Sequence, residues 1–280
     1  MIVTELAVGA LDGLARLQIQ PGLGRTIELA LQAAYGLGYM HERKPFPVVH
    51  RDLKPANLMI VGGGDACRGR RSEALLNYGV LKIADFGLSK TLDSLTNGKH
   101  AARHADFLPT GETGTVSRST GRRASGVGPP DPLGPGGDAV RGGLTPEPSR
   151  QYRYMAPEVY KHEYYDHKVD VYSYGIILYQ LFEKKPAYEG LDPLQTARAA
   201  ATEGMRPAFH RSAGQKNKFH TPEPIRKLIA DCWQSDPNLR PEFRDIIARL
   251  TAFRDERTAA ARSSSKAKGL LTSMFGLGSG

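Results

Sequence analysis

The side chains best suited to chemistry lie in three short stretches: "VVHRDLKPANLMI" at 48–60, "ADFG" at 84–87 and "MAPE" at 155–158. The first stretch holds Asp52, Lys54 and Asn57, and the second holds Asp85. A carboxylate can accept a proton or bind a cation, an amide oxygen can bind a hard cation, and an ammonium group can neutralise negative charge. Groups of these types position and neutralise a reacting anion more than they attack it covalently.

In this order, the three stretches resemble the catalytic loop, the metal-binding loop and the end of the activation segment of protein kinases. The resemblance implies ATP-dependent phosphorylation of serine or threonine on protein substrates, with ATP and Mg²⁺ as cofactors. It implies that Asp52 accepts the proton of the substrate hydroxyl and that Lys54 lies near the transferred phosphate. It also implies that Asn57 and Asp85 bind Mg²⁺.

Other residues receive supporting roles from the same resemblance. His50 would pack inside the loop and take no part in proton transfer. Arg51 would either pair with a phosphorylated residue of the activation segment or serve a structural role, and both interpretations stay open. Asp170, in "DVYSYGI", would hydrogen-bond the catalytic-loop backbone, and Glu158 would pair with Arg240 of "CWQSDPNLRP".

Two further patterns narrow the resemblance. The sequence "YRYMAPE" and the Cys-Trp pair at 232–233 resemble the tyrosine-kinase-like group of serine/threonine kinases, and integrin-linked-kinase-like members in particular. "MIVTEL" resembles the hinge of a kinase, with Thr4 as gatekeeper. The backbone of Glu5 and Ala7 would then contact adenine, and Met59 would form the floor beneath it.

The elements that must position these residues are mainly helical. Apolar residues recur at helical spacing over 25–42, and further helices are predicted over 167–182, 192–204, 223–233 and 241–262. Asp192 is expected to cap its helix, and Pro241 is expected in a first helical turn. Short strands are expected at 48–49 and within 79–87. The predicted fold is therefore mainly α with a few short strands, as in the C-terminal lobe of the protein-kinase-like fold.

This resemblance predicts a domain organisation: a hinge remnant at 1–8, a kinase C-lobe at 9–255 and a flexible tail at 256–280. A glycine-rich phosphate loop, a strand lysine and its partner glutamate are not recognised, so we expect a chain without an N-lobe and without phosphoryl transfer on its own. The chain is then a fragment or truncated gene model of an active kinase. The alternatives are a catalytically inactive C-lobe acting as a binding or scaffold module, and a nucleic-acid binder.

Residues 116–151 differ in composition from the sequence on either side. Eight Gly and six Pro account for 14 of these 36 residues, and no aromatic residue is present. Such a segment cannot bury enough apolar area to offset its ordering entropy, so it is predicted to be disordered. It is interpreted as a retained intron or as a genuine insertion. Thr110 and Thr113, just before it, are candidate phosphorylation sites.

Composition limits the remaining function classes. The net charge of +9 would suit an anionic partner, but the Lys and Arg residues are scattered and no nucleic-acid module is recognised, so a nucleic-acid partner is not expected. The two cysteines have no metal-type spacing and indicate a reducing compartment. The longest apolar run is too short to span a bilayer. We expect a cytoplasmic or nuclear protein with a protein substrate, and the sequence predicts no oligomeric state.

Overall fold

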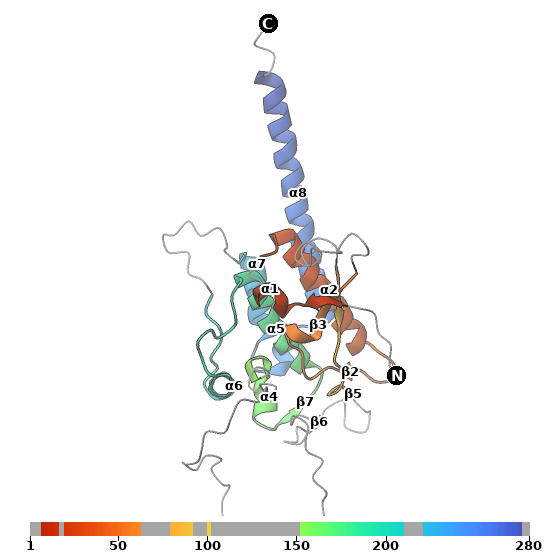
Figure 1. The fold of residues 1–280 in the computed structure, drawn as a ribbon, viewed down its shortest axis with the longest axis vertical. Coiled ribbons are helices and arrows are strands. Elements are labelled where there is room, and N and C mark those ends of the chain that lie inside the picture. Colours follow the sequence, from red (N-terminus) through yellow and green to blue (C-terminus); the bar gives the residue numbers. More distant parts are fainter. Residues whose placement is uncertain are drawn as a thin grey trace, which may run out of the picture.

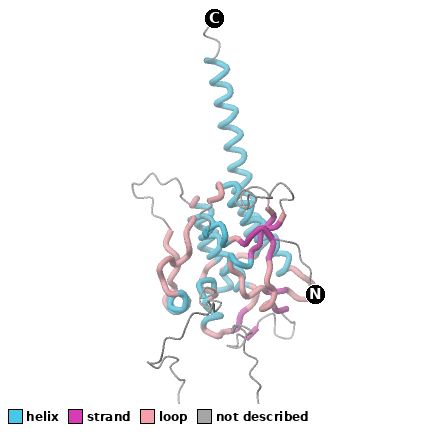
Figure 2. Tube along the Cα trace, viewed as in Figure 1, coloured by secondary structure: helices cyan, strands magenta, loops and turns pink. Residues whose placement is uncertain are grey.

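A computed structural model describes residues 7–16, 20–62, 79–91, 100–101, 152–209 and 221–275. The predictions for Thr4, Glu5, Thr110 and Thr113, and for the segment 116–151, lie outside the described residues. The described part is mainly helical with a few short strands, so the predicted fold class is confirmed (Figures 1 and 2).

The elements have the following bounds. The α-helices are α1 (Asp12–Arg16), α2 (Leu23–His41), α4 (Pro157–Tyr160), α5 (Lys168–Glu183), α6 (Pro193–Thr202), α7 (Glu223–Cys232) and α8 (Phe243–Phe275). Short 3-10 helices are η1 (Pro55–Asn57) and η6 (Pro237–Leu239). The strands are β1 (Ala7–Ala10), β2 (Val48–Val49), β3 (Leu58–Val61), β4 (Val80–Ile83), β5 (Lys90–Thr91), β6 (His100–Ala101) and β7 (Tyr164–Tyr165).

Helix α5 is the centre of the hydrophobic core. It is buried on nearly every side and packs against α2 and α7, as expected of a helix that is apolar all round. The hydroxyl of Tyr174 donates to the carbonyl of Ala30 on α2 at 2.8 Å. Gly175 faces α7 so closely that a Cβ there would lie 2.8 Å from Cys232 Cβ. The elements attached to α5 are therefore held by a helix buried in the core.

A three-stranded antiparallel sheet, in the order β1-β3-β4, brings two of the chemical stretches together. Strand β3 begins directly after Asn57, and β4 ends directly before Ala84 and Asp85. Leu58 pairs with Ile83, so the start of β3 lies beside the end of β4. The antiparallel register therefore puts Asn57 and Asp85 at the same end of the sheet.

Two element boundaries differ from the prediction. Strand β1 runs to Ala10, past the 1–8 segment expected as the hinge remnant, because β3 pairs with it that far. Pro241 lies before α8 and not in its first turn, because the carbonyl of Glu242 accepts the first helical bond, from Ile246 N at 3.0 Å. By contrast, Asp192 caps α6 as predicted, accepting from Gln195 N at 2.8 Å.

Helix α8 is longer than predicted. It was expected to end at 262 and continues to Phe275, projecting away from the rest of the protein (Figure 1). Residues 263–275 contain no proline, so every residue of the extension can donate a helical backbone hydrogen bond. The flexibility expected of 256–280 stays a prediction. Among the described helices, none combines the length and apolar character needed to cross a membrane.

Candidate active site

The catalytic-loop stretch is anchored to α5 by Asp170. One carboxylate oxygen accepts from His50 N at 2.8 Å and the other accepts from Arg51 N at 2.9 Å. The first oxygen is also 2.9 Å from His41 Nε2, at the end of α2. Asp170 thus makes the backbone contact that the resemblance implies, and His41 adds a second helix to the anchor.

Asp170 is fully buried yet keeps an acidic carboxyl group. Burial alone would raise its pKa, since it penalises the charged form. The hydrogen bond and charge of His41, the charge of His50 and the His50 backbone bond oppose this, and the net direction is a lowered pKa. The carboxylate therefore remains an acceptor for the loop amides.

Arg51 has a left-handed backbone conformation, with φ at 69°, which is uncommon for a residue with a side chain. Its guanidinium donates to the carbonyl of Leu88 and, at 3.0 Å, to Tyr165 OH on β7. Together with the hydrogen bond from the Arg51 backbone N–H to Asp170, these contacts hold a backbone conformation that an isolated peptide would avoid. Arg51 therefore has a structural role here, and its pairing with a phosphorylated residue stays a prediction.

The side chains of Asp52, Lys54 and Asn57 form one hydrogen-bonded cluster. Lys54 Nζ lies 2.6 Å from Asp52 Oδ2, and both side chains are largely buried. Asn57 Nδ2 donates to the Asp52 carbonyl at 2.8 Å and to Asp52 Oδ2 at 3.2 Å. The amide of Asn57 thereby fixes the turn of the loop, and its other end, the carbonyl oxygen, is left as an acceptor.

Two contacts of Ala84 connect the Asp85 stretch to the catalytic loop. Ala84 N donates to the carbonyl of Asn57 at 2.9 Å, and the Ala84 carbonyl is 3.0 Å from His50 Nε2. His50 is fully buried, as the resemblance implies, and its ring centroid is 5.5 Å from that of Phe86. Asp85 itself is exposed and has φ at 63°. Asp85 is therefore exposed to solvent, one residue after the backbone bond that joins Ala84 to Asn57.

The end of the activation segment is fixed by a buried ion pair. Arg240 Nη1 and Nη2 lie 2.6 Å and 2.8 Å from the two carboxylate oxygens of Glu158, with both residues almost fully buried. The guanidinium also lies over the Tyr172 ring, 5.2 Å from its centroid. Lys168 Nζ donates to the Arg240 carbonyl at 2.5 Å. The pairing implied by the resemblance is thus present in the structure.

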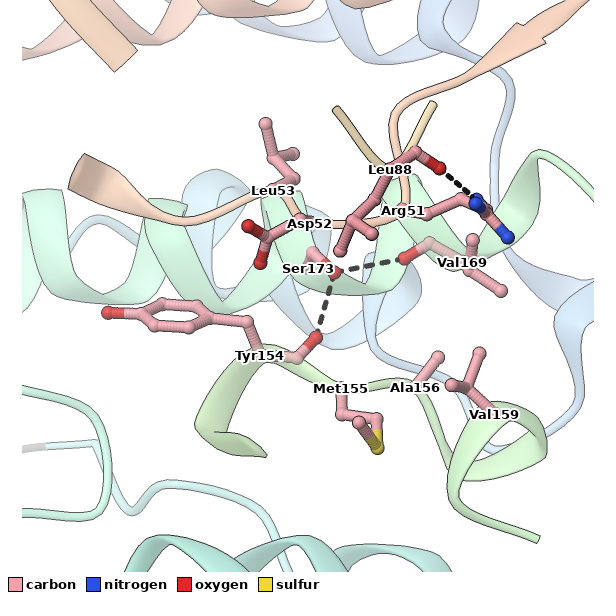
Figure 3. A pocket seen from close by; sticks show the side chains of 10 residues that line it. All are labelled: Arg51, Asp52, Leu53, Leu88, Tyr154, Met155, Ala156, Val159, Val169 and Ser173. Atoms are coloured by element: carbon pink, nitrogen blue, oxygen red, sulfur yellow. Dashed lines mark hydrogen bonds between the residues drawn. The ribbon is translucent and has the colours of Figure 1, made fainter. Parts of the chain in front are cut away.

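Helix α5 also holds the segment that runs past Asp52. Ser173 Oγ donates to the Tyr154 carbonyl at 2.8 Å. A cavity of about 20 Å³ lies between this segment and the catalytic loop, lined by Asp52, Tyr154 and Ser173 among others. The Asp52 carboxylate and the Tyr154 ring project to the same side of it (Figure 3). One helix therefore positions the catalytic loop and the segment opposite it.

The residues expected near adenine are only partly described. Ala7 lies in β1 opposite Val61, and Met59 lies in β3 opposite Ala10. Both side chains are partly exposed. They share one sheet with the strand that leads to Asp85. Their contact with adenine stays a prediction.

Sequence reasoning missed His41, Tyr165 and Lys168, which support the catalytic loop and the Glu158 ion pair. A histidine at a helix end, a tyrosine in a short strand and a lysine at a helix start are all common on protein surfaces. Their partners are 129, 114 and 72 residues away in the chain. No local pattern in the sequence could have identified these contacts.

Comparisons with known proteins agree with this arrangement. A family model described as "Protein kinase domain" matches residues 1–110, and one described as "Protein tyrosine and serine/threonine kinase" matches residues 145–250. The chain belongs to the protein kinase superfamily. The stretch 111–144 lies outside both matches and largely coincides with the predicted insertion 116–151.

Relatives of this kinase chain include three protein kinases of Arabidopsis thaliana. Serine/threonine-protein kinase VIK is 33% identical over 91% of the chain and 44% of its own length. Integrin-linked protein kinase 1 is 29% identical over 81% of the chain and 35% of its length, and serine/threonine-protein kinase STY17 is 29% identical over 80% and 26%. These matches support the tyrosine-kinase-like type. The chain spans less than half the length of each of these relatives.

Proposed function

We propose that this protein transfers the terminal phosphoryl group of ATP to serine or threonine hydroxyls of protein substrates. The observation that supports this most strongly is the hydrogen-bonded cluster of Asp52, Lys54 and Asn57. The cluster holds a carboxylate, a cation and an amide in contact with one another. Asp170 fixes the loop by accepting hydrogen bonds from two of its backbone amides. A reaction that depends on positioning more than on covalent help gains from such a fixed set of groups.

Each residue of the cluster has a distinct part in the proposed reaction. Asp52 accepts the proton of the substrate hydroxyl as that oxygen attacks the phosphorus. Lys54, with its ammonium group 2.6 Å from Asp52 Oδ2, neutralises negative charge where the phosphoryl group is transferred. Asn57 holds the Asp52 backbone at 2.8 Å, so that the carboxylate keeps its direction during the proton transfer.

The donor set fits Mg²⁺. The cation prefers oxygen ligands and keeps several waters, so one or two protein oxygens suffice. Asn57 uses its Nδ2 atom toward Asp52, which leaves its side-chain oxygen for a metal, and Asp85 is exposed at the same end of the sheet. When bound, the metal would neutralise charge on the ATP phosphates.

The test is the Asp52→Asn variant. It is made in the protein translated from the complete messenger RNA, because residues 1–280 alone are expected not to transfer phosphate. The isosteric amide cannot accept the proton, so transfer of radiolabelled phosphate to a generic serine/threonine substrate should fall about 10²–10⁴-fold. The melting temperature should stay unchanged. Asp245→Asn, at an exposed position of α8, is the matched control and should retain full activity.

Two results would contradict the proposal. One is a wild-type protein that transfers no phosphate, which would favour the inactive binding or scaffold module. The other is near-wild-type turnover of Asp52→Asn, which would exclude Asp52 as the base. Phosphoamino-acid analysis of the labelled substrate decides between hydroxyls of serine or threonine and those of tyrosine.

A further inference from the structure

The C-terminal part of helix α8 extends beyond the rest of the protein (Figure 1). Among the side chains of α8 that the structure describes, Phe253 is the last that is buried, and residues 254–264 are all exposed. The hydroxyls of Thr258 and Ser263 donate to carbonyls of α8 itself, at 2.9 Å and 3.1 Å. Packing against the described core therefore does not explain the sequence of this part of the helix.

The sequence from Arg257 onward is positively charged. Residues 257–280 contain Arg257, Arg262, Lys266 and Lys268 and no Asp or Glu. A solvated helix usually mixes both signs of charge, because pairs three or four residues apart stabilise it. Cations without such partners, on a helix that projects into solvent, instead favour an anionic binding partner.

The same helix has an apolar face at the end farthest from the rest of the protein. Positions 267, 270, 271, 274 and 275 follow the spacing i, i+3, i+4, i+7 and i+8, which brings them to one face of an α-helix. These positions are Ala267, Leu270, Leu271, Met274 and Phe275. At 3.6 residues per turn, positions 262 and 266, with Arg and Lys, fall outside this face. The last four turns of α8 therefore form a basic amphipathic helix.

A basic amphipathic helix suits three kinds of partner: an anionic lipid surface, a groove in an acidic protein, or a second copy of itself. A second copy is disfavoured, because like charges would meet and the apolar spacing lasts little more than one heptad. A protein groove holds a helix by apolar anchors along its length, whereas the bulky apolar residues here are confined to the last two turns. A lipid surface needs only a short apolar insertion next to cations.

We propose that residues 257–275 of α8 bind the surface of membranes that contain anionic lipids. The bulky apolar residues enter the boundary between headgroups and acyl chains, and the cations contact the anionic headgroups. Because the other side of the helix is polar, it lies in the membrane surface and does not cross the bilayer. The proposal uses no residue of the candidate active site and does not depend on the proposed function.

Vesicle flotation of the full chain tests this proposal. Vesicles of phosphatidylcholine with about 30% phosphatidylserine are compared with vesicles of phosphatidylcholine alone, in about 0.1 M salt. Bound protein floats with the vesicles, whereas aggregated protein sediments. Each Lys or Arg near an anionic surface strengthens binding about 5-fold. The anionic vesicles should therefore bind the chain about 10- to 100-fold more tightly, and about 1 M salt should remove most of this difference.

Paired substitutions assign the charge preference to α8. Lys266→Gln combined with Lys268→Gln should weaken binding to the anionic vesicles about 25-fold, because two cations are lost. The control is Lys161→Gln combined with Lys227→Gln, which removes two exposed cations from other parts of the protein and gives the same net charge. This control should bind like the wild-type chain.

The apolar face is tested separately. Leu270→Ser combined with Leu271→Ser should remove binding to both kinds of vesicle. Trp233 is the one tryptophan of the sequence and lies in the core, 6% exposed, so its emission should not respond to vesicles. Phe275→Trp adds a second tryptophan, whose emission should shift to shorter wavelength when anionic vesicles are added, because the indole leaves water for the interface.

Several outcomes would overturn the proposal. One is equal binding to the two kinds of vesicle, or binding to neither. Another is a preference for anionic vesicles that the lysine pair in α8 does not change. Self-association through Leu270 and Leu271 in sedimentation equilibrium, without vesicle binding, would assign the apolar face to a second copy of the chain. Binding that needs the lysines but not the leucines, with no shift in emission of Phe275→Trp, would show simple attraction of a polycation without insertion.

Discussion

The variant Arg240→Ala removes the ion pair between Glu158 and Arg240. The guanidinium makes a two-pronged contact with the carboxylate at 2.6 Å and 2.8 Å, and the two side chains are 0% and 4% exposed. Removing one partner leaves a buried charge without compensation, which costs about 3–5 kcal/mol. The carbonyls of Lys168 and Gln234 lose donors as well. In a protein of this size the melting temperature should fall by roughly 6–20 °C.

Differential scanning calorimetry of the wild-type chain and the variant measures this change. Arg244→Ala is the matched control: its ion pair, with Asp245 at 3.8 Å, is on the exposed face of α8, and it should move the melting temperature by less than about 2 °C. Adding Glu158→Gln to Arg240→Ala should recover part of the loss, because the stranded charge disappears. If Arg240→Ala melts like the control, the electrostatic reasoning is refuted.

Three further expectations concern other parts of the fold. Asp192→Ala should destabilise the protein by about 1 kcal/mol in chemical denaturation, because the α6 amide of Gln195 loses its cap; no change would contradict the capping role. Burial raises the pKa of Cys232 to about 12, so in a Cys67→Ser background native protein at pH 8 should resist iodoacetamide, and alkylation as fast as in urea would contradict this. Lys184 has a lowered pKa of about 8, so the folded state loses this proton first and stability relative to Lys184→Met should rise above pH 8, by at most about 1.4 kcal/mol per pH unit toward pH 10. A flat or falling difference in denaturant titrations would exclude that protonation behaviour.

The sequence predicted those parts of the protein in which a strong local pattern coincides with burial. The apolar repeat of 25–42 became α2, and the apolar run of 167–182 became the core helix α5, each within two residues of the predicted bounds. Asp192 could be assigned as a cap because its side chain contacts an amide only three residues away. In such cases the physical cause lies within the segment itself.

The resemblance supplied what local patterns could not. Asp170 lies 120 and 119 residues from the two loop amides whose hydrogen bonds it accepts, and Glu158 lies 82 residues from Arg240. Hydrophobic periodicity and secondary-structure propensity carry no information about contacts over such separations. These contacts could be expected only because whole stretches matched a known family.

A cavity of about 530 Å³ at the end of α5 could not be predicted by either route. Its lining comes from α1, the loop before α2, the catalytic loop, Tyr154 and the end of α5. Lys184 lies there because it ends α5 with φ at 57°, a conformation that glycine adopts more readily than lysine. Nothing in "FEKKPAY" indicates that the first lysine turns inward. Tertiary packing alone decides this.

The bonds from Asp170 to the loop amides affect how the loop opens. Loops usually fluctuate independently, and their amide protons exchange with solvent through small local openings. The amides of His50 and Arg51 instead donate to a fully buried carboxylate on the core helix. Exposing them leaves a buried carboxylate without two of its donors, which costs more than opening a loop whose amides are bonded to water. Their amide protons should therefore exchange more slowly than those of an ordinary loop, and the loop keeps its shape while these bonds hold.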